Sequence, residues 1–335
     1  MSYKLKTLIV FDTNSLRSTS EKEVAYSVFD FGRPYRVIEE FISTNRLTDD
    51  VKIAIPLWVI EELKDQKNKQ YQKDLEDLSR ITTRLNGLPG YSDIKIPKTT
   101  FDCKAYIENQ ALLYLSAKSI FLLEIKEEIA KDVLKSMMER VMRDEKMKKP
   151  FAHSGKYKDA GFKDNLVWES LMNFEGLVDF DKVIFLTKDG DYNNCEYEFR
   201  AKWNKHIDIE KDENNVIVKI SADYENYIFE RSIYDFAQSE YYAQYLYEEL
   251  KNKSMITVNG YEYPIENFVI KDICKYVKRD HIAEDDIENI YITSAVDIHF
   301  TANKKKKVQQ VQASTMLWDD ETKEIVSTEY DYLLI

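Results

Sequence analysis

The sequence predicts an α/β fold with a mostly parallel sheet in its first 205 residues, followed by a β-rich α+β extension. Three short apolar runs, TLIVF at 7–11, VKIAI at 51–55 and DKVIFLT at 181–187, have the composition of strands buried on both faces. Segments with helical spacing of apolar residues separate these runs. Because strands and helices alternate, we expect the strands to run parallel, with helices on both faces of the sheet.

Helical patterns fill most of the chain between the predicted strands. The stretch 103–149 is predicted to be helical throughout, as one bent helix or two, and to end at Pro150. The following residues, 151–163, are basic, contain glycine and lack an apolar period, so we expect a loop there. The predicted helices are 34–47, 58–85, 103–149 and 164–174.

The sequence changes character after about residue 205. HIDIEKDENNVIVKIS at 206–221 is expected to hold one or two strands around the DENN turn, and a Tyr-rich helix follows at 222–252. Three segments then alternate in polarity, which predicts a β-meander: 288–302, 308–318 and 324–334. We therefore divide the chain into a first domain, a connecting region and a small β-meander domain: 1–205, 206–250 and 251–335.

The composition is that of a protein with a substantial core. Hydrophobic residues make up 44% of the 335 residues, and 48 basic against 60 acidic residues give a net charge of −12. An acidic total argues against a surface that binds nucleic acid everywhere, but it leaves room for a local basic groove. Three scattered cysteines, four histidines without zinc-like spacing and no long apolar run lead us to expect a cytoplasmic protein without a membrane segment.

Acidic residues follow the predicted strands or begin the next helix. Asp12 ends the first strand, and Asp189 with Asp191 follow the third. Glu61 and Glu62 lie one helical turn beyond the second strand, and Asp164 begins a helix. Taken singly, each could be a helix cap, a turn residue or a solvated charge. Together they are expected to meet in the crevice at the carboxyl ends of the parallel strands.

Several carboxylates in one crevice require compensation, because like charges raise one another's pKa. A hard divalent cation, Mg²⁺ or Mn²⁺, is the usual compensation. Such an ion polarises a phosphate and lowers the pKa of a bound water, so the pattern predicts phosphodiester hydrolysis without a nucleophilic side chain.

Four segments, FDTNSL, VIEEL, GFKDNLVWESL and FLTKDGDY, resemble in order the four acidic motifs of PIN-domain nucleases. The GFKD…W version is similar to a bacterial branch of larger, stand-alone members. The resemblance covers residues 5–205 and implies a three-layer α/β/α sandwich and a metal-dependent endonuclease that acts on RNA, or less often on DNA. The stretch 103–149 and the chain beyond 205 exceed the minimal domain, so no substrate follows from the small members of the family.

The resemblance also implies which residues form the site. The first acid is Asp12, with Thr13 and Asn14 as its companions. The second is Glu62, with Glu61 as the alternative. The remaining catalytic and metal-binding acids would be Asp164, Asp189 and Asp191.

A basic stretch precedes Asp164. Between residues 143 and 163 there are seven basic and three acidic residues. Phosphate groups need such local cations, although lysines at a helix end can also be merely solvated. The candidate substrate-binding residues are Asn14, His153, Lys156, Lys158 and Lys163.

Two other classes of protein fit part of the pattern. Phosphatases of the haloacid-dehalogenase type need a second Asp two residues after the first, and Asn14 occupies that position. A catalytically silent PIN-like protein, which binds nucleic acid or regulates a partner, remains the alternative. RNA is the expected partner, and the C-terminal region could carry a homo-oligomer or protein contact.

Overall fold

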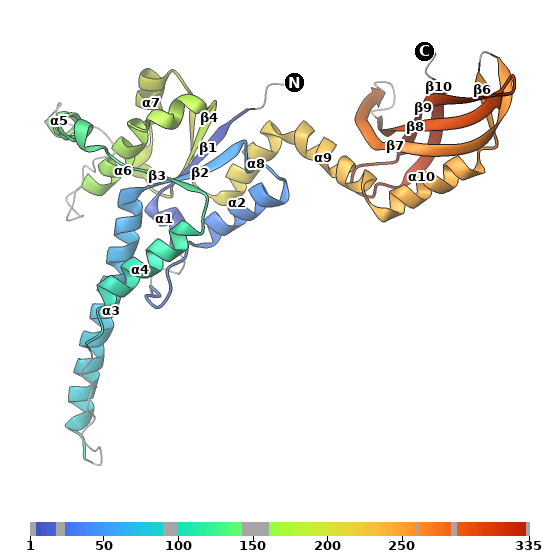
Figure 1. Ribbon diagram of the computed structural model, residues 1–335. Coiled ribbons are helices and arrows are strands. Elements are labelled where there is room, and N and C mark those ends of the chain that lie inside the picture. Colours follow the sequence, from blue (N-terminus) through green and yellow to red (C-terminus); the bar gives the residue numbers. More distant parts are fainter. Residues whose placement is uncertain are drawn as a thin grey trace. The chain divides into compact units, whose positions relative to one another are not determined.

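The apolar run Thr7–Phe11 forms β1, the middle strand of a five-stranded sheet in the computed structural model (Figure 1). The strand order is β3-β2-β1-β4-β5, and all neighbours are parallel. Every residue of β1 is buried, as expected of a strand covered on both faces. The five strands are β1 (Thr7–Phe11), β2 (Val51–Pro56), β3 (Ile120–Leu123), β4 (Lys182–Leu186) and β5 (Ile207–Glu210).

The structure describes two units, each built around a sheet of its own. They are Met1–Asp223 and Tyr224–Ile335. This division differs from the domain limits near residues 205 and 250 expected from the sequence, and those limits stay predictions. Within the described ranges, no helix combines the length and the apolar composition needed to cross a membrane. The described residues are 5–17, 24–89, 100–142, 161–258, 260–282 and 287–332.

Helices cover both faces of the parallel sheet. Val10 is paired in register with Phe185 of β4, so both side chains lie on one face, and Phe185 packs against Trp168 of α6 with ring centroids 6.2 Å apart. The next residue, Phe11, points to the opposite face, where its ring lies 5.7 Å from Tyr35 of α2. The unit is therefore the three-layer α/β/α sandwich that the sequence predicts. Its helices are α1 (Thr13–Leu16), α2 (Arg33–Thr44), α3 (Leu57–Asn86), α4 (Cys103–Ser116), α5 (Ala130–Met142), α6 (Phe162–Met172), α7 (Glu196–Trp203) and α8 (Glu213–Asp223).

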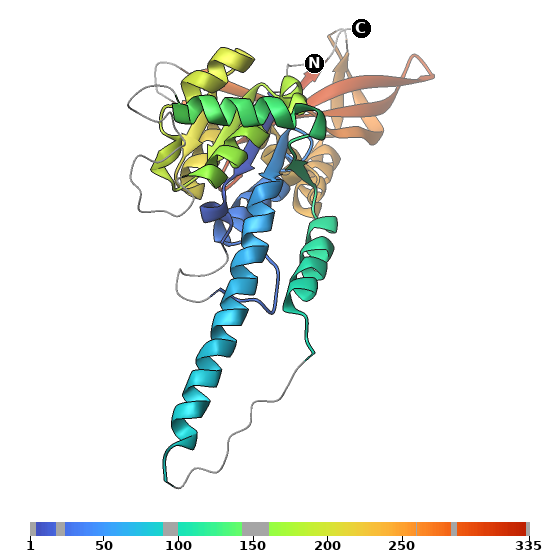
Figure 2. The same ribbon diagram turned by 90° about the vertical axis from the view of Figure 1, so that its left-hand side faces the viewer.

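The long helix α3 extends beyond the sheet, and α4 packs beside it (Figures 1 and 2). Phe101, just before α4, contacts Tyr71 of α3 and Tyr106 of α4, with ring centroids 5.8 and 5.4 Å apart. The Tyr106 hydroxyl also donates to the backbone oxygen of Ser27 at 2.8 Å. Aromatic packing thus holds the two helices together outside the sandwich.

Two predicted elements are wrong. The stretch 103–149 is not helical throughout, because Ile120–Leu123 forms the edge strand β3, in register with β2 from Ile53↔Ile120. Of the one or two strands expected around DENN, one forms as β5, and in place of a second strand the chain forms helix α8. Its start is capped by Asp212, whose side chain accepts two backbone N–H groups at 2.9 and 3.0 Å. Val216 and Ile220, four residues apart, then bury one helical face.

The second unit contains a five-stranded antiparallel sheet of order β10-β9-β8-β7-β6. The three meander strands predicted from the sequence are confirmed as β8, β9 and β10, and two strands not predicted precede them. The predicted Tyr-rich helix is divided at Ser239, whose hydroxyl accepts the Tyr242 N–H and caps a second helix. The elements are α9 (Glu225–Ala237), α10 (Glu240–Asn252), β6 (Met255–Val258), β7 (Tyr261–Ile282), β8 (Ile287–Ala302), β9 (Lys305–Leu317) and β10 (Ile325–Tyr332).

Helix α10 covers one face of this sheet (Figure 1). The core between them includes a chain of hydroxyl groups. Tyr242 donates to Thr315 at 3.0 Å, and Thr315 lies 2.9 Å from the hydroxyl of Thr328. Tyr245 reaches the same Thr328 hydroxyl at 3.1 Å. Because each hydroxyl is partnered, the core can bury these polar atoms without leaving them unsatisfied.

A buried ion-pair network joins α5 to α6 and α7. Arg140 of α5 is only 3% exposed and pairs with Glu169 of α6 at 3.0 Å. It also donates to both carboxylate oxygens of Glu198 in α7, at 2.8 and 2.6 Å. Ser136 donates to the same Glu169 oxygen at 2.7 Å. The network fixes α5 against the helix that begins with the third acidic motif.

Replacing Arg140 by Met should destabilise the first unit by about 3 kcal/mol or more, because it leaves the buried Glu169 charge without its cation. Urea unfolding followed by tryptophan fluorescence would measure the change, since Trp58, Trp168 and Trp203 all lie in this unit. Arg80→Met, at the exposed pair with Asp77, is the control and should leave the transition nearly unchanged. Equal midpoints for the two variants would show that the network adds no stability.

Candidate metal centre

Asp12 lies at the carboxyl end of β1, where β1 pairs with β4. Its backbone N–H donates to the oxygen of Leu186 at 3.0 Å, which continues the parallel ladder one residue past the strand. The side chain is only 3% exposed, and the hydroxyl of Thr187 donates to its Oδ2 at 2.9 Å. The pairing of β1 with β4 therefore holds a buried carboxylate at the carboxyl ends of these two central strands.

The same hydroxyl organises the turn after β4. Thr187 Oγ1 accepts the N–H of Asp189 at 3.0 Å, and Asp189 Oδ1 accepts the N–H of Asp191 at 2.9 Å. Thr187 thus joins the first acidic segment to the fourth. We did not select it from the sequence, although a hydroxyl residue that directly follows a buried strand and precedes acids was a usable signal.

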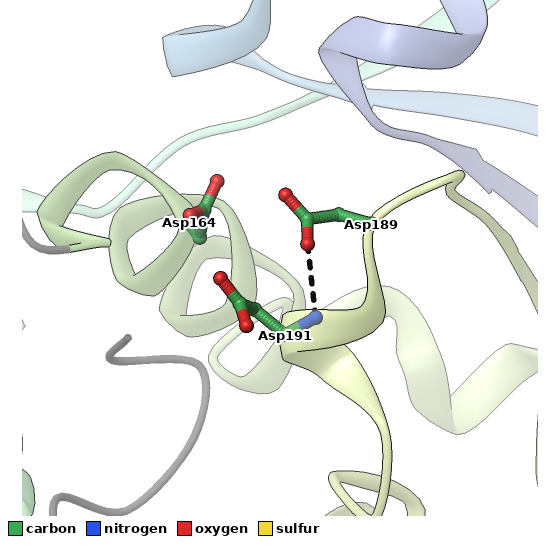
Figure 3. Close-up of side chains that lie close together, drawn as sticks. All are labelled: Asp164, Asp189 and Asp191. Atoms are coloured by element: carbon green, nitrogen blue, oxygen red, sulfur yellow. Dashed lines mark hydrogen bonds between the residues drawn. The ribbon is translucent and has the colours of Figure 1, made fainter. Parts of the chain in front are cut away.

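Asp164, Asp189 and Asp191 bring their carboxylates together (Figure 3). One oxygen from each lies within 4.8 Å of the others. Asp164 belongs to the first turn of α6, which begins at Phe162, after Gly161 with its left-handed φ of 81°. The Tyr192 hydroxyl donates to the backbone oxygen of Asp164 at 3.3 Å and ties the turn to α6. Three oxygen ligands from two elements therefore face one small volume.

The Glu62 side chain lies beside these acids at the carboxyl end of the sheet, whereas the Glu61 side chain is exposed to solvent. Thr13, next to Asp12, donates its hydroxyl to Glu62 Oε2 at 2.7 Å. Lys163 lies 3.7 Å from the other Glu62 oxygen. Glu61 instead pairs with Lys64 one turn along α3, at 2.5 Å. The geometry favours Glu62 over Glu61 as a member of the site.

Burial and mutual repulsion raise the pKa values of two of these acids. Burial raises the pKa of Asp164 to about 7, and the charges of Asp12 and Asp189 push it in the same direction. Burial also raises the pKa of Asp12 to about 6, against the lowering effect of its hydrogen bond from Thr187. The pKa of Tyr192, fully buried beside the acids, is raised well above its usual range, mainly by burial. Four acidic groups, one buried and three partly buried, thus lie close enough to disfavour one another's charged forms.

The donor set fits a hard divalent cation. All the converging ligand atoms are carboxylate oxygens, the ligands that Mg²⁺ and Mn²⁺ favour. A bound cation would also offset the repulsion that raises the pKa of Asp164. The acidic cluster is therefore compatible with metal binding.

Two of the five predicted substrate-binding residues, Asn14 and Lys163, lie within the described part of the chain. Asn14 lies in α1, partly exposed, and the Lys163 side chain is 48% exposed beside Glu62. His153, Lys156 and Lys158 lie outside the described residues.

In a parallel α/β/α sandwich the carboxyl ends of the central strands form the ligand-binding crevice, and the acidic side chains gather there. A family model described as the PIN domain matches residues 9–192. This match spans more than half of the chain, so the protein belongs to the PIN-domain family, and the resemblance noted in the sequence is confirmed. No curated protein and no solved structure shows significant similarity to the chain.

Raising the pH from 5 to 8 in a chelator should lower the melting temperature of the wild type more than that of Asp164→Asn. The folded state binds a proton on each of these acids more tightly than the unfolded chain does, because its pKa values are about 6 for Asp12 and about 7 for Asp164. This tighter proton binding contributes stability to the fold. That contribution is complete below the ordinary value of 3.8 and is lost as the pH rises through 6 to 7.

Differential scanning fluorimetry across the pH series would measure this difference. Asp77→Asn, which removes an exposed acid from α3, is the control and should follow the wild type. Parallel pH profiles for the wild type and Asp164→Asn would contradict the electrostatic reading of the cluster.

Proposed function

We propose that the protein is a divalent-metal-dependent endonuclease that hydrolyses phosphodiester bonds in RNA. The observation that carries the proposal is the convergence of Asp164, Asp189 and Asp191 beside the buried Asp12. Mg²⁺ or Mn²⁺ is the proposed cofactor. The proposed setting is the cytoplasm, in keeping with three free, buried cysteines.

The site contains two kinds of residue: acids that would bind the ion, and hydroxyl residues that position those acids. We assign metal binding and catalysis to five acids, of which three form the compact group and two are anchored by hydroxyls. A bound divalent ion supplies Lewis-acid polarisation of the phosphate and a water of lowered pKa. Thr187 and Thr13 act as positioning residues, because they donate to Asp12 and Glu62. The five acids are Asp12, Glu62, Asp164, Asp189 and Asp191.

Substrate contact is assigned to groups beside the acids. Lys163 is exposed next to Glu62 and can meet a phosphate oxygen of the strand. Asn14 follows Asp12 and Thr13 in α1 and offers an amide that can donate or accept. We propose His153, Lys156 and Lys158 as further contacts, on the strength of the basic stretch in which they occur.

Glu62→Gln should abolish metal-dependent cleavage of single-stranded RNA, because it removes a carboxylate charge from the site. Glu61→Gln is a closely matched control, because it makes the same change at the neighbouring residue, whose side chain is exposed. Cleavage of a labelled RNA with Mn²⁺, measured as initial rate, would compare them. A Glu62→Gln variant as active as Glu61→Gln would remove Glu62 from the site.

Mg²⁺ or Mn²⁺ should raise the melting temperature, and chelation should stop cleavage. An ion that binds only the folded state stabilises it by about 2.7 kcal/mol at 100 times its Kd. Asp164→Asn should reduce this thermal shift, because it removes one of the three converging ligands. Thermal titration with each ion, beside cleavage assays with and without EDTA, would test both effects. A metal-induced shift without RNA or DNA cleavage would instead support the catalytically silent, nucleic-acid-binding alternative.

A further inference from the structure

The C-terminal unit contains a pocket of its own, and none of the five acidic site residues lines it. A cavity of about 410 Å³ lies between α9 and β7. Tyr227, Arg231 and Tyr234 of α9 form one wall, and Lys275 with Tyr276 of β7 lies on the other. All of these residues belong to one unit.

An irregularity in β7 shapes this pocket. The pairing of β7 with β8 shifts between Asp272↔Ala295 and Tyr276↔Thr293, so four steps along β7 match two along β8. The extra residues bulge out of the ladder. Hydrogen bonding holds the bulge, because the hydroxyl of Ser294 donates to the backbone oxygen of Ile273 at 2.7 Å. The Asp272 side chain also accepts the N–H of Cys274 at 3.1 Å.

The pocket offers aromatic faces and cationic groups together. The guanidinium of Arg231 lies 5.0 Å from the ring centroid of Tyr234, and Tyr234 is 37% exposed. Arg231 pairs with Asp235 at 3.3 Å, yet its Nε–H is buried without a hydrogen-bond partner among the described residues. Tyr276 is 44% exposed, and its hydroxyl donates to Gln312 at 3.1 Å, which fixes the ring.

The rest of the lining is compatible with a planar ligand. Cys274 is buried, and burial raises the pKa of its thiol to about 11, so it acts as a small neutral group. Glu230 is an acidic member of the lining, opposed by Arg231 and Lys275. A planar ligand with an anionic group fits this lining, in which two cations face Glu230, and its anion would share Arg231 with Asp235.

We propose that this pocket binds one nucleotide, with its base stacked on the tyrosines and its phosphate near Arg231 and Lys275. Aromatic side chains stack on any base, and an arginine beside them adds a cation–π and a phosphate contact. The unit as a whole is acidic, with 12 basic against 21 acidic residues from 224 to 335. Affinity should therefore come from the pocket and not from a broad positive surface.

A nucleotide of this kind has two sources, a free mononucleotide or one residue of a single-stranded RNA. Titration calorimetry of the full chain in EDTA with each of the four ribonucleoside monophosphates tests the first. Fluorescence anisotropy with a labelled single-stranded octaribonucleotide tests the second. The chelator prevents metal-dependent cleavage, so the result does not depend on the proposed nuclease activity.

Tyr234→Ala and Arg231→Ala should each weaken the affinity for whichever probe binds, mononucleotide or octaribonucleotide, by about fivefold or more. Tyr234→Phe should retain binding, because it keeps the aromatic face. The matched control is Tyr261→Ala, an exposed tyrosine of β7 outside the pocket. Arg231→Ala should also lower the slope of log affinity against log salt by about 0.7, the effect of one lost single-strand phosphate contact.

Lys275→Glu, at an exposed strand position, repeats the test if an alanine variant does not fold. It should likewise weaken binding, because it replaces a cation by an anion beside the phosphate. Absence of binding to both probes would overturn the proposal. Binding that Tyr234→Ala, Arg231→Ala and Lys275→Glu leave unchanged, with all three folded, would overturn it equally.

Discussion

The gathering of partly buried carboxylates at the carboxyl ends of the central strands is the constraint on which the N-terminal unit depends. Repulsion and burial act against this arrangement, as the raised pKa values of Asp12 and Asp164 show. The framework holds the acids in part through neutral donors, namely the hydroxyls of Thr187 and Thr13 and backbone N–H groups in the turn after β4. These donors fix geometry without cancelling the negative charge, and the charge stays available to a cation.

The elements predicted correctly are those whose local pattern agrees with their environment. β1 and β4 are buried on both faces, so a continuous apolar run identifies them, and the acids beyond their ends follow from parallel topology. β3 is only four residues long, and its pairing with β2, invisible in the local sequence, decides its conformation. The bond from Thr187 to Asp12 likewise joins positions 175 residues apart, so the local sequence does not show the partner of this hydroxyl.

The C-terminal core and the acidic site treat polar groups in opposite ways. In the C-terminal core, the hydroxyls of Tyr242, Thr315 and Thr328 partner one another, remain neutral and fix α10 on the sheet. At the carboxyl end of the parallel sheet, the buried Asp12 and three partly buried aspartates are ionisable and repel one another. The first arrangement adds specificity to the fold, whereas the second costs stability without a ligand. This contrast separates a structural polar cluster from a candidate functional one.

The parallel pairing of β1 with β4 also orders events during synthesis. Asp12 and Thr187, which share a hydrogen bond, are 175 residues apart in the chain. At a translation rate of 5–20 residues per second, about 9–35 s pass between the addition of the first and of the second. Throughout that interval the emerging polypeptide contains Asp12 but neither Asp189 nor Asp191 of the last acidic motif. The complete acidic cluster therefore cannot form until more than half of the chain has been synthesised, at which point the residues after Asp191 are still to be added.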